Sequence, residues 1–554
     1  MSIDRSKIQW NGWGWAAHKD SIPDAAWPWI AAELGMPSLL ATPARPLEEI
    51  ALPATRLDDE GRAKFAGIVG ADRVHGDKYE RAFHARGRSY HDLLYLRAGN
   101  IPSAPDAVIY PRGTDEVLAL LSYASESGIA VVPFGGGTSV VGGVSANAGA
   151  FKVVISLDLS GMDRLIDVDH VSGMASAEAG IYGPALEKAL QMKGVTLGHY
   201  PQSFEFSTLG GWIAHRGAGQ QSGRYGKAED WLASAKIATP RGLLSTQDFP
   251  KSAAGPRLTD FFVGSEGAFG IVTEAQFRVH AVPKVQDFRG FLFRDFATGA
   301  AAIREAVQND VPVSMLRLSD PDETYFYRAF SKVGKRPGLK DKIEKAVLDW
   351  RGFGEKPCAL IAVFEGDNDD VSHARKHFAK IAKNLGAMSI GSGPGKRWRE
   401  GRFHGPYLRD PLMERGVGVD TLETATSWSK IDALYNAVRA ALENSIRETA
   451  PRPGARGIVM CHISHSYATG ASLYFTYIFP RALDGEVAQW QTIKKAASDA
   501  IAANGGTLSH HHGVGEDHLP WMAAEKGALG IDVLRAVKNA LDPKGILNPG
   551  KLIP

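Results

Sequence analysis

Three glycine-rich loops restrict the fold of this chain more than any other feature of its sequence. The first loop reads PFGGGTSVVGGV at 133–144 and directly follows the apolar, β-branched run Ile129–Phe134. Three consecutive glycines allow a backbone to approach a ligand closely and to turn its N–H groups toward phosphate oxygens. Thr138 and Ser139 add hydroxyl donors. The segment therefore predicts an anion-binding loop, with a plain glycine-rich turn as the alternative that local chemistry leaves open.

Two common phosphate-binding loops do not match this segment. A Walker loop ends in Gly-Lys-Ser/Thr, which is absent here. A Rossmann fingerprint that starts at Gly135 needs a glycine where Val140 stands, and no helical pattern follows.

The other two loops are also rich in glycine and small residues. They read YPQSFEFSTLGGWIAHRGAGQQSGRY at 200–225 and GSEGAFGIVTE at 264–274. The chain contains 61 glycines in 554 residues, which is about 11% where about 7% is usual. Three such loops in one stretch of chain suit a large, extended ligand that carries a diphosphate, such as a coenzyme lying across a cleft.

Strand-like and helix-like segments alternate around these loops, which predicts an α/β or α+β fold. The first hundred residues are irregular, but five tryptophans fall within the first 29, and we expect this arm to pack on the body of the protein. After Pro283 the glycine density falls, and GSGPGKRWREGR at 391–402 has the composition of a mobile, basic loop. The expected strands are 107–110, 129–134, 153–157, 168–179, 315–318, 359–364 and 473–479, and the expected helices are 184–193, 300–307, 341–350, 429–443 and one N-capped by Thr114.

Composition excludes several classes of protein. With 63 Lys+Arg against 61 Asp+Glu the net charge is +2, which argues against nucleic acid as the main partner. Cys358 and Cys461 are too few for a disulfide framework or a cysteine-built metal site. No secretory signal, apolar run long enough to span a bilayer or peroxisomal Ser-Lys-Leu ending is present. We expect a cytoplasmic protein, with peripheral membrane contact and a homodimer left open.

Seven motifs spread over almost the whole chain carry a family resemblance. They are WNGWGW at 10–15, PFGGGTS at 133–139, SFEFSTLGGW at 203–212, GSEG at 264–267, YLRD at 407–410, ASLYF at 471–475 and LSHHHGVG at 508–515. GGGTS and GSEG are similar to the FAD-binding fold of the vanillyl-alcohol oxidase type. SFEFSTLGGW, YLRD and LSHHHGVG resemble, more specifically, the alkylglycerone-phosphate synthase (alkyl-dihydroxyacetone-phosphate synthase) family of that superfamily.

The resemblance implies an α+β architecture with non-covalently bound FAD. The FAD-binding domain has two subdomains, and an α+β cap domain adds to it. The implied units are an N-terminal Trp-rich arm and helical segment (1–100), a PCMH-type FAD-binding domain (101–283), a substrate or cap domain (284–500) and a His-loop and C-terminal segment that returns to the FAD domain (501–554). The residues it assigns to FAD are Pro133, Phe134, Gly135, Gly136, Gly137, Thr138, Ser139, Gln202, Ser203, Phe204, Glu205, Phe206, Ser207, Thr208, His215, Arg216, Gly217, Ala218, Glu266, Gly267, Ala268, Phe269, Gly270, Ile271 and Val272.

The same resemblance assigns the reacting groups. His510, His511 and His512 line the flavin and substrate site, with a metal site as the weaker alternative and no metal expected. Tyr474 abstracts a proton, although a structural tyrosine is the commoner outcome in a strand. Its phenol, with a pKa near 10, needs hydrogen bonds or positive charge to ionise, and nearby histidines and arginines could supply them. Arg409 binds the substrate phosphate. Arg317 is important for activity, with a surface-facing strand arginine as the alternative.

The implied reaction replaces the acyl group of acyl-dihydroxyacetone phosphate by a long-chain alcohol, without net redox change, through a flavin N5 adduct. Gln202 and His215 stand where the family has Asp and Thr, and the tail 542–554 is closer to FAD-dependent 2-hydroxy-acid dehydrogenases or oxidases. That class is the alternative function. Its His-containing GDGN-type metal segment is absent from the corresponding SHSYATGASLYF at 464–475, which favours the synthase.

Overall fold

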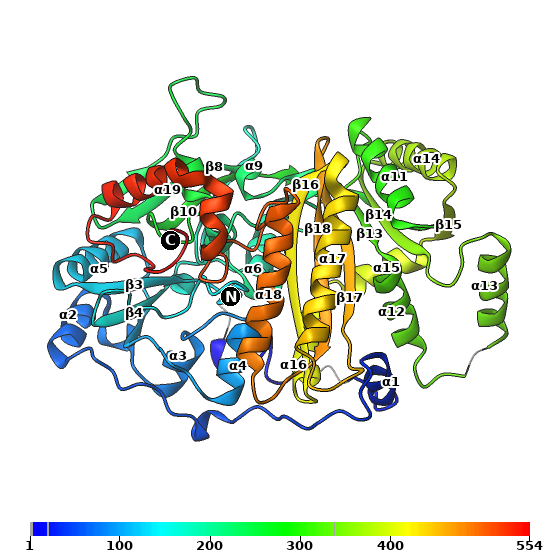
Figure 1. The fold of residues 1–554 in the computed structure, drawn as a ribbon. Coiled ribbons are helices and arrows are strands. Elements are labelled where there is room, and N and C mark those ends of the chain that lie inside the picture. Colours follow the sequence, from blue (N-terminus) through cyan, green and yellow to red (C-terminus); the bar gives the residue numbers. More distant parts are fainter. Residues whose placement is uncertain (1–3, 19–21, 337) are drawn as a thin grey trace.

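The computed structural model describes residues 4–18, 22–336 and 338–554. Three sheets organise these residues, with four, five and seven strands in the orders β1-β2-β4-β3, β5-β6-β10-β8-β9 and β15-β12-β14-β13-β17-β18-β16, and β11 pairs with β7 (Figure 1). Most strand pairs are antiparallel, and among the strands of the described residues only β2–β4 and β3–β4 run parallel. The expected α+β class is confirmed.

The first glycine loop begins at the end of a strand in the small mixed sheet. Strand β3 is an almost unbroken apolar run and is buried along nearly its whole length, as a parallel strand covered on both faces should be. Helix α5 packs on it, and the chain leaves the carboxyl end of β3 directly into Gly135. The elements of this layer are α2 (Asp59–Val69), β1 (Val74–His75), β2 (Ala107–Ile109), α5 (Thr114–Ser127), β3 (Ile129–Phe134) and β4 (Val153–Asp158).

The five-stranded antiparallel sheet shares one hydrophobic core with the first sheet. The Ser-rich loop runs between its strands β6 and β8, and the GSEG loop leads into β10. Its elements are β5 (Leu165–Asp169), β6 (Met174–Glu178), α6 (Gly183–Gln191), β7 (Val195–Thr196), α7 (Leu209–Ala214), α8 (Ser222–Tyr225), α9 (Ala228–Trp231), β8 (Leu232–Thr239), β9 (Gly242–Ser245), α10 (Thr259–Phe262), β10 (Ile271–Arg278) and β11 (His280–Ala281).

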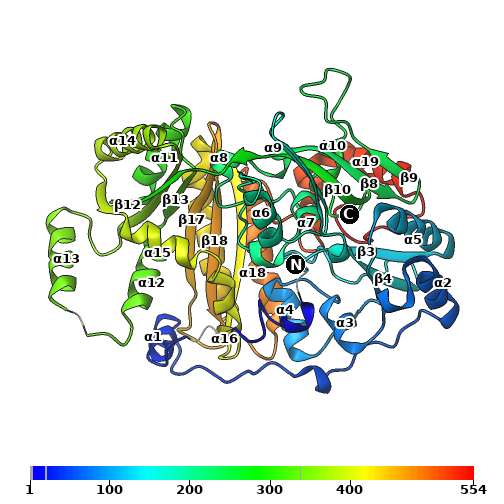
Figure 2. The ribbon, with the colours of Figure 1, turned by 180° about the vertical axis from the view of Figure 1, so that it is seen from behind.

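The seven-stranded sheet is antiparallel and has two different faces. Helices α11, α14, α17 and α18 cover one face, with α17 and α18 in front of the sheet in Figure 1, whereas α15 lies in front of it in the view from behind (Figure 2). Its strands are β12 (Val285–Phe293), β13 (Met315–Ser319), β14 (Cys358–Gly366), β15 (Met388–Gly391), β16 (Val417–Ser427), β17 (Ile458–Ser466) and β18 (Gly470–Pro480). Its helices are α11 (Phe296–Gln308), α12 (Pro321–Lys332), α13 (Leu339–Trp350), α14 (Asn368–Asn384), α15 (Gly393–Gly401), α16 (Arg409–Met413), α17 (Ile431–Glu448) and α18 (Glu486–Ala503).

Both ends of the chain return to the body of the protein. Trp10 and Trp13 are buried, and the Trp13 ring meets Phe206 edge-on with ring centroids 5.8 Å apart, so the expected packing of the tryptophan arm is confirmed. Past α19 (Met522–Leu541), Leu547 pairs in parallel with Val131 of β3. The C-terminal segment therefore meets the sheet that carries the first glycine loop, and the N-terminal arm packs against the second loop at Phe206.

Four sequence-based expectations about local structure are wrong. The first hundred residues are not irregular, because they include α1 (Ala26–Glu33), α3 (Lys78–Phe83) and α4 (Tyr90–Ala98) besides α2. Residues 168–179 form parts of two strands joined by a turn. Thr114 is the first helical residue rather than the cap, since its hydroxyl bonds to Thr273 at 3.0 Å and Gly113 precedes the helix.

The fourth wrong expectation is the mobile loop at 391–402. This segment forms α15, whose Trp398 packs against the cluster of Phe288, Met315 and Val363. A Cβ added at Gly395 would lie 2.8 Å from the Phe288 Cβ, so the glycine allows the helix to approach β12 closely. Tertiary packing thus overrides a local composition that favours a loop. Among the described residues, none of the helices is both long and apolar enough to span a membrane.

Candidate active site

One large cavity lies between the glycine loops and the face of the seven-stranded sheet opposite α17 and α18. Its volume is about 1550 Å³, which exceeds the 300–1,000 Å³ of an ordinary ligand pocket. All three glycine loops, strands β13, β16, β17 and β18, and helices α12, α13 and α15 contribute to its lining. The cavity is therefore large enough to hold an extended coenzyme together with a substrate.

The first glycine loop is shaped by contacts that exclude side chains. A Cβ added at Gly136 would lie 1.6 Å from the Phe206 carbonyl oxygen, and Gly137 has a φ of +70°. These positions require glycine, and they let bare backbone face the cavity at the end of β3. The loop thus fits a diphosphate-bearing group such as FAD, which its backbone N–H groups and the Thr138 and Ser139 hydroxyls would hold.

Most of the residues expected to contact FAD line this cavity. They are Pro133, Phe134, Gly135, Gly136, Gly137, Thr138, Ser139, Gln202, Ser203, Ser207, Thr208, His215, Gly217, Ala218, Glu266, Gly267, Gly270, Ile271 and Val272. The lining does not include Phe204, Glu205, Phe206, Arg216, Ala268 or Phe269. The Arg216 side chain is 45% exposed and lies 3.8 Å from Glu229, so it points away from the cavity.

Glu266 connects the third glycine loop to the histidine loop. Its buried carboxylate accepts hydrogen bonds from the N–H groups of Val514 (2.7 Å) and Gly515 (2.8 Å). Its own carbonyl accepts a bond of 2.6 Å from the Asn548 side chain near the C-terminus. Segments more than two hundred residues apart in the chain are therefore held together at one end of the cavity.

The histidine triplet rests on a second buried carboxylate, that of Glu423 on β16. Three consecutive backbone N–H groups, of His510, His511 and His512, donate to it at 2.7, 3.0 and 2.9 Å, and the Ser509 hydroxyl donates at 2.8 Å. Burial alone would raise the pKa of Glu423, but the imidazoles and the backbone donors hold it well below 4.5. The interpretation of this triplet as a solvent-exposed run is excluded.

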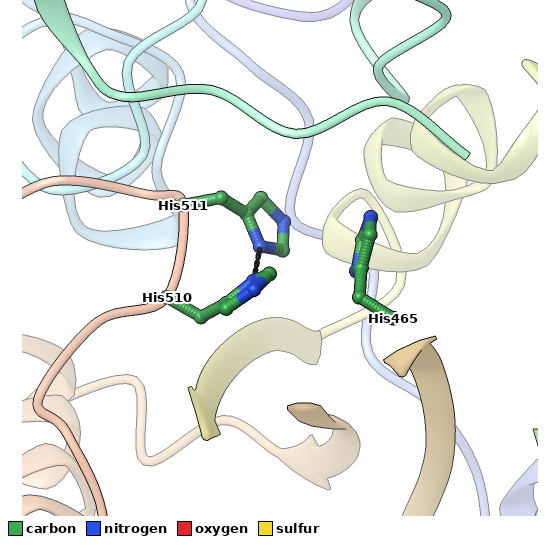
Figure 3. Close-up of side chains that lie close together, drawn as sticks. All are labelled: His465, His510 and His511. Atoms are coloured by element: carbon green, nitrogen blue, oxygen red, sulfur yellow. Dashed lines mark hydrogen bonds between the residues drawn. The ribbon is translucent and has the colours of Figure 1, made fainter. Parts of the chain in front are cut away.

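His510 and His511 also form a cluster with His465 of β17, drawn in Figure 3, with one ring nitrogen from each within 4.8 Å of the others. This spacing would suit a metal ion. However, the protein itself bonds both nitrogens of His510, to Tyr467 Oη (2.6 Å) and His511 Nδ1 (3.0 Å). Both nitrogens of His465 are bonded as well, at 2.8 Å to the Ser464 hydroxyl and at 3.0 Å to the Gly219 carbonyl. The three imidazoles therefore belong to a hydrogen-bonded network.

Burial keeps these imidazoles neutral. It lowers the pKa of His465 to about 4 and holds those of His510 and His511 well below 6.5. The buried ammonium of Lys227, which donates to the His510 carbonyl at 2.7 Å, adds to the effect. Of the triplet, His511 and His512 line the cavity and His510 lies behind them. The cavity wall can therefore offer neutral hydrogen-bonding groups near pH 7.

Tyr474 lies at the centre of a row of polar side chains. On β18 it is paired in register with Glu423 on β16 and with His462 on β17, and register partners point to the same face of a sheet. The His462 ring stacks on the Tyr474 ring with centroids 5.0 Å apart and an interplanar angle of 18°. The His511 and His512 rings lie 6.1 and 5.5 Å from it. The expected catalytic tyrosine and two of the three histidines are thus brought together on the cavity wall.

The surroundings do not favour the Tyr474 phenolate in the way the sequence suggested. Burial raises the pKa of Tyr474 to about 12, and the opposing effect of Arg409 is smaller. The histidines contribute no positive charge because they are neutral. These surroundings therefore favour the neutral phenol near pH 7.

The two expected arginines face the same cavity. Arg409 begins α16, and its buried Nε has no hydrogen-bond partner among the described residues. An unpaired guanidinium edge in a cavity is a ready anion site. Arg317 on β13 is only 20% exposed and donates to Glu323 at 2.9 Å, so the surface-facing alternative is wrong.

Several residues that shape the site were not predicted from the sequence. Arg5, in the N-terminal arm, donates to the Gly135 carbonyl at 2.6 Å and to Asp158 at 2.9 Å, and so secures the glycine loop from behind. No periodicity marks an arginine in such an arm. Glu423 did leave a signal, because a carboxylate in a strand that is buried along most of its length needs a specific partner. His462 and Glu323 lie on elements whose pairing only the fold reveals.

The fold and the cavity define an FAD-binding flavoenzyme of the FAD-linked oxidase type. Residues 105–247 match the family described as "FAD binding domain", and residues 282–552 match "FAD linked oxidases, C-terminal domain". These matches confirm FAD as the cofactor.

Full-length relatives identify the family. The chain is 34% identical to alkyldihydroxyacetonephosphate synthase of Dictyostelium discoideum over 99% of this chain and 94% of that protein. The synthase of Trypanosoma brucei brucei is 35% identical over 88% of this chain and 79% of that protein. A solved structure of alkyldihydroxyacetonephosphate synthase superposes with a TM-score of 0.84 at 32% identity, covering 99% of this chain and 100% of that one. The chain belongs to the alkyldihydroxyacetonephosphate synthase family of FAD-dependent enzymes, and the resemblance in its motifs is confirmed.

Proposed function

We propose that this enzyme exchanges the acyl group of acyl-dihydroxyacetone phosphate for a long-chain alcohol and so forms an ether lipid precursor. The observation that carries the proposal is the composition of a single cavity. Its lining combines the glycine loops, the polar group of Tyr474, Arg409 and the histidines, and a set of apolar side chains that includes residues of α13, here called the apolar arm. The arm is lined by Leu292, Ile343, Val347, Leu348, Ile361, Met388, Ile390 and Trp398.

Each part of this cavity matches one part of the substrates. The phosphate monoester fits the unpaired guanidinium of Arg409, whose planar fork suits phosphate oxygens. The alkyl chains fit the apolar arm, where each buried CH₂ contributes about 0.8 kcal/mol. C1 of the dihydroxyacetone unit then lies between the anchored phosphate and the chain, next to Tyr474. Anchoring at both ends raises the effective concentration of C1 at the reacting groups.

The residues of this chain act on protons and on position. Tyr474 would accept the C1 proton, which is acidified by the neighbouring carbonyl, and Arg409 would stabilise the nearby phenolate. The neutral imidazoles of His511 and His512 would hydrogen-bond to the reacting oxygens. When bound, FAD supplies an electron-accepting ring over which negative charge at C1 can be delocalised, with no net oxidation. Glu423 fixes the histidine backbone, so these donors need little reorganisation.

The direct test uses the purified FAD-loaded protein with palmitoyl-dihydroxyacetone phosphate and hexadecanol. We expect palmitate and the alkyl ether in equal amounts, while the flavin absorbance returns to its starting level. D-lactate and glycolate serve as alternative substrates. Stoichiometric flavin reduction by either of them, with no ether product, would contradict the proposal and favour a 2-hydroxy-acid dehydrogenase.

We also propose that the protein is cytoplasmic and contacts membranes peripherally, because both substrates partition into bilayers. Helix α13 supports this proposal, since Ile343, Val347 and Trp350 are 56%, 40% and 79% exposed, and Ile343 and Val347 also line the cavity arm. Exposed apolar groups beside a site for lipids are typical of an interfacial contact. Co-sedimentation with phosphatidylcholine vesicles should be weakened by Trp350→Ser, whereas Leu529→Ser, at a 78% exposed position of α19 outside the cavity lining, should have little effect. Equal sedimentation of wild type and Trp350→Ser would contradict the role of α13.

A further inference from the structure

A carboxylate–imidazole pair on the cavity wall takes no part in the proton transfer proposed for Tyr474. His462 of β17 and Glu323 of α12 both line the cavity, and they are only 8% and 2% exposed. The His462 Nδ1 lies 2.9 Å from Glu323 Oε1, and Arg317 Nη2 lies 2.9 Å from the same oxygen. The pair adjoins the reacting centre, because the His462 ring stacks on Tyr474.

The hydrogen bonds fix the tautomer of His462. Burial works against a charged Glu323, yet His462 and Arg317 hold its pKa at about 2, so the carboxylate carries no proton near neutral pH. A 2.9 Å contact between Nδ1 and a carboxylate oxygen then requires the proton to be on Nδ1. Arg317 Nη2 also lies 3.2 Å from this nitrogen, but its shorter bond, of 2.9 Å, goes to the Glu323 oxygen. Burial and Arg317 lower the pKa of His462, so the ring is neutral. Its Nε2 is consequently the basic nitrogen, and no described residue bonds to it.

The proposed exchange needs a base at this position. The departing group is a carboxylate, which leaves with the electron pair of its bond to C1 and requires no proton. The entering group is an aliphatic alcohol, which is not ionised at neutral pH and must lose its hydroxyl proton as its oxygen bonds to C1. Tyr474 is already assigned to the C1 proton, so a second acceptor is required.

We propose, on the basis of the function above, that His462 Nε2 accepts the hydroxyl proton of the incoming alcohol and that Glu323 holds the ring in position. The alcohol O–H bond breaks toward Nε2, and an alcohol lone pair forms the O–C1 bond. The acyl oxygen departs as carboxylate, Tyr474 returns a proton to C1, and the imidazolium releases its proton to solvent before the next turnover. Atoms and charge balance without any oxidant or reductant. His462 is thus a further catalytic residue, and Glu323 is its positioning residue.

His511 and His512 are weaker candidates for this role. Their Nδ1 atoms lie 3.6 and 3.8 Å from Glu423, beyond hydrogen-bond distance, so that carboxylate does not fix their tautomers. His511 Nδ1 is in addition bonded to His510 at 3.0 Å. His462 Nδ1 lies 2.9 Å from Glu323, whereas the other cavity imidazole near a carboxylate, His215, has its Nδ1 3.3 Å from Glu266 and forms no hydrogen bond there with a described residue.

The experiment compares two exchange reactions in the same FAD-loaded enzyme. Ether formation with hexadecanol requires proton removal from the nucleophile, whereas incorporation of labelled palmitate into palmitoyl-dihydroxyacetone phosphate uses a nucleophile that is already ionised. In His462→Gln we expect ether formation to fall by about 10²–10⁴-fold, the usual contribution of a general base, while palmitate incorporation stays near its wild-type rate. In Glu323→Gln the same selective loss should be smaller. His373→Gln, at an exposed position of α14, is the control.

The possible outcomes distinguish a wrong role for His462 from a wrong function for the enzyme. A parallel fall of both reactions in a variant that retains the wild-type FAD spectrum would overturn the role of His462, as would unimpaired ether formation. If His462→Gln does not fold, the selectivity of Glu323→Gln decides in the same way. Absence of both reactions in the wild-type enzyme would instead reject the proposed function itself.

Discussion

Replacing Glu423 by Gln removes the charge that lies beneath the histidine loop. In the native protein one carboxylate oxygen accepts three hydrogen bonds, from the Ser509 hydroxyl and the N–H groups of His511 and His512. The other oxygen accepts the His510 N–H at 2.7 Å. An amide keeps one acceptor only. If its oxygen takes the first position, its NH₂ group faces the His510 N–H donor.

The expected loss follows from these four bonds. One charge-assisted bond disappears, which costs about 1.5–3 kcal/mol, and the other three become neutral bonds of roughly half the strength. Together we expect a destabilisation of about 4–7 kcal/mol, at or above the roughly 3–5 kcal/mol that breaking a buried ion pair costs. Glu414→Gln, at a carboxylate that is 54% exposed and paired with Arg97, should change stability by less than about 1 kcal/mol.

Urea denaturation of both variants at several pH values provides the assay. The folded-state pKa of Glu423 lies well below the usual 4.5, so the unfolded chain binds its proton first as the pH falls. The stabilisation is therefore complete above about pH 5 and decreases at lower pH. The difference in unfolding free energy between wild type and Glu423→Gln should stay constant from pH 8 to 5 and then decrease. A difference below about 1 kcal/mol at pH 7, or one that increases in acid, would refute the stabilisation of the histidine loop by the Glu423 carboxylate.

Three other substitutions test the remaining parts of the site. Arg5→Met should lower the unfolding free energy by about 3–5 kcal/mol, because Asp158 loses its guanidinium partner. It should also raise the dissociation constant for FAD. An unchanged FAD titration would show that the glycine loop does not need the contact with Arg5. Tyr474→Phe should keep the bound-flavin spectrum but lose hydrogen exchange at C1, measured by tritium release, and normal release would remove the tyrosine from this step. Arg409→Ala should raise the KM for the phosphorylated substrate by about 10–100-fold, as expected for charge-assisted bonds of 1.5–3 kcal/mol, whereas an equal fall in kcat at constant KM would place the phosphate elsewhere.

Local chemistry indicated an anion-binding loop at the cofactor end of the site, with a plain glycine-rich turn left open, and the motif resemblance then pointed to FAD. Glycine at 135–137 is required by backbone geometry, so its signature is contiguous in the sequence and independent of distant residues. The apolar run Ile129–Phe134 likewise indicated a buried strand without further information. The same reasoning failed at 391–402, where Trp398 gains burial that composition cannot reveal.

The sequence by itself determined the flavin class and the residues with distinctive motifs, among them Tyr474, Arg409 and the histidine triplet. The motif identities, however, did not reveal how these groups are supported. Strand register places Glu423, Tyr474 and His462 in one row, and the return of both termini brings Arg5 to Gly135 and Asn548 to Glu266. Burial then sets the protonation states, lowering the pKa values of the histidines and raising that of Tyr474. Only tertiary structure decides these properties, because they depend on desolvation and on charges from distant segments, which local sequence does not encode.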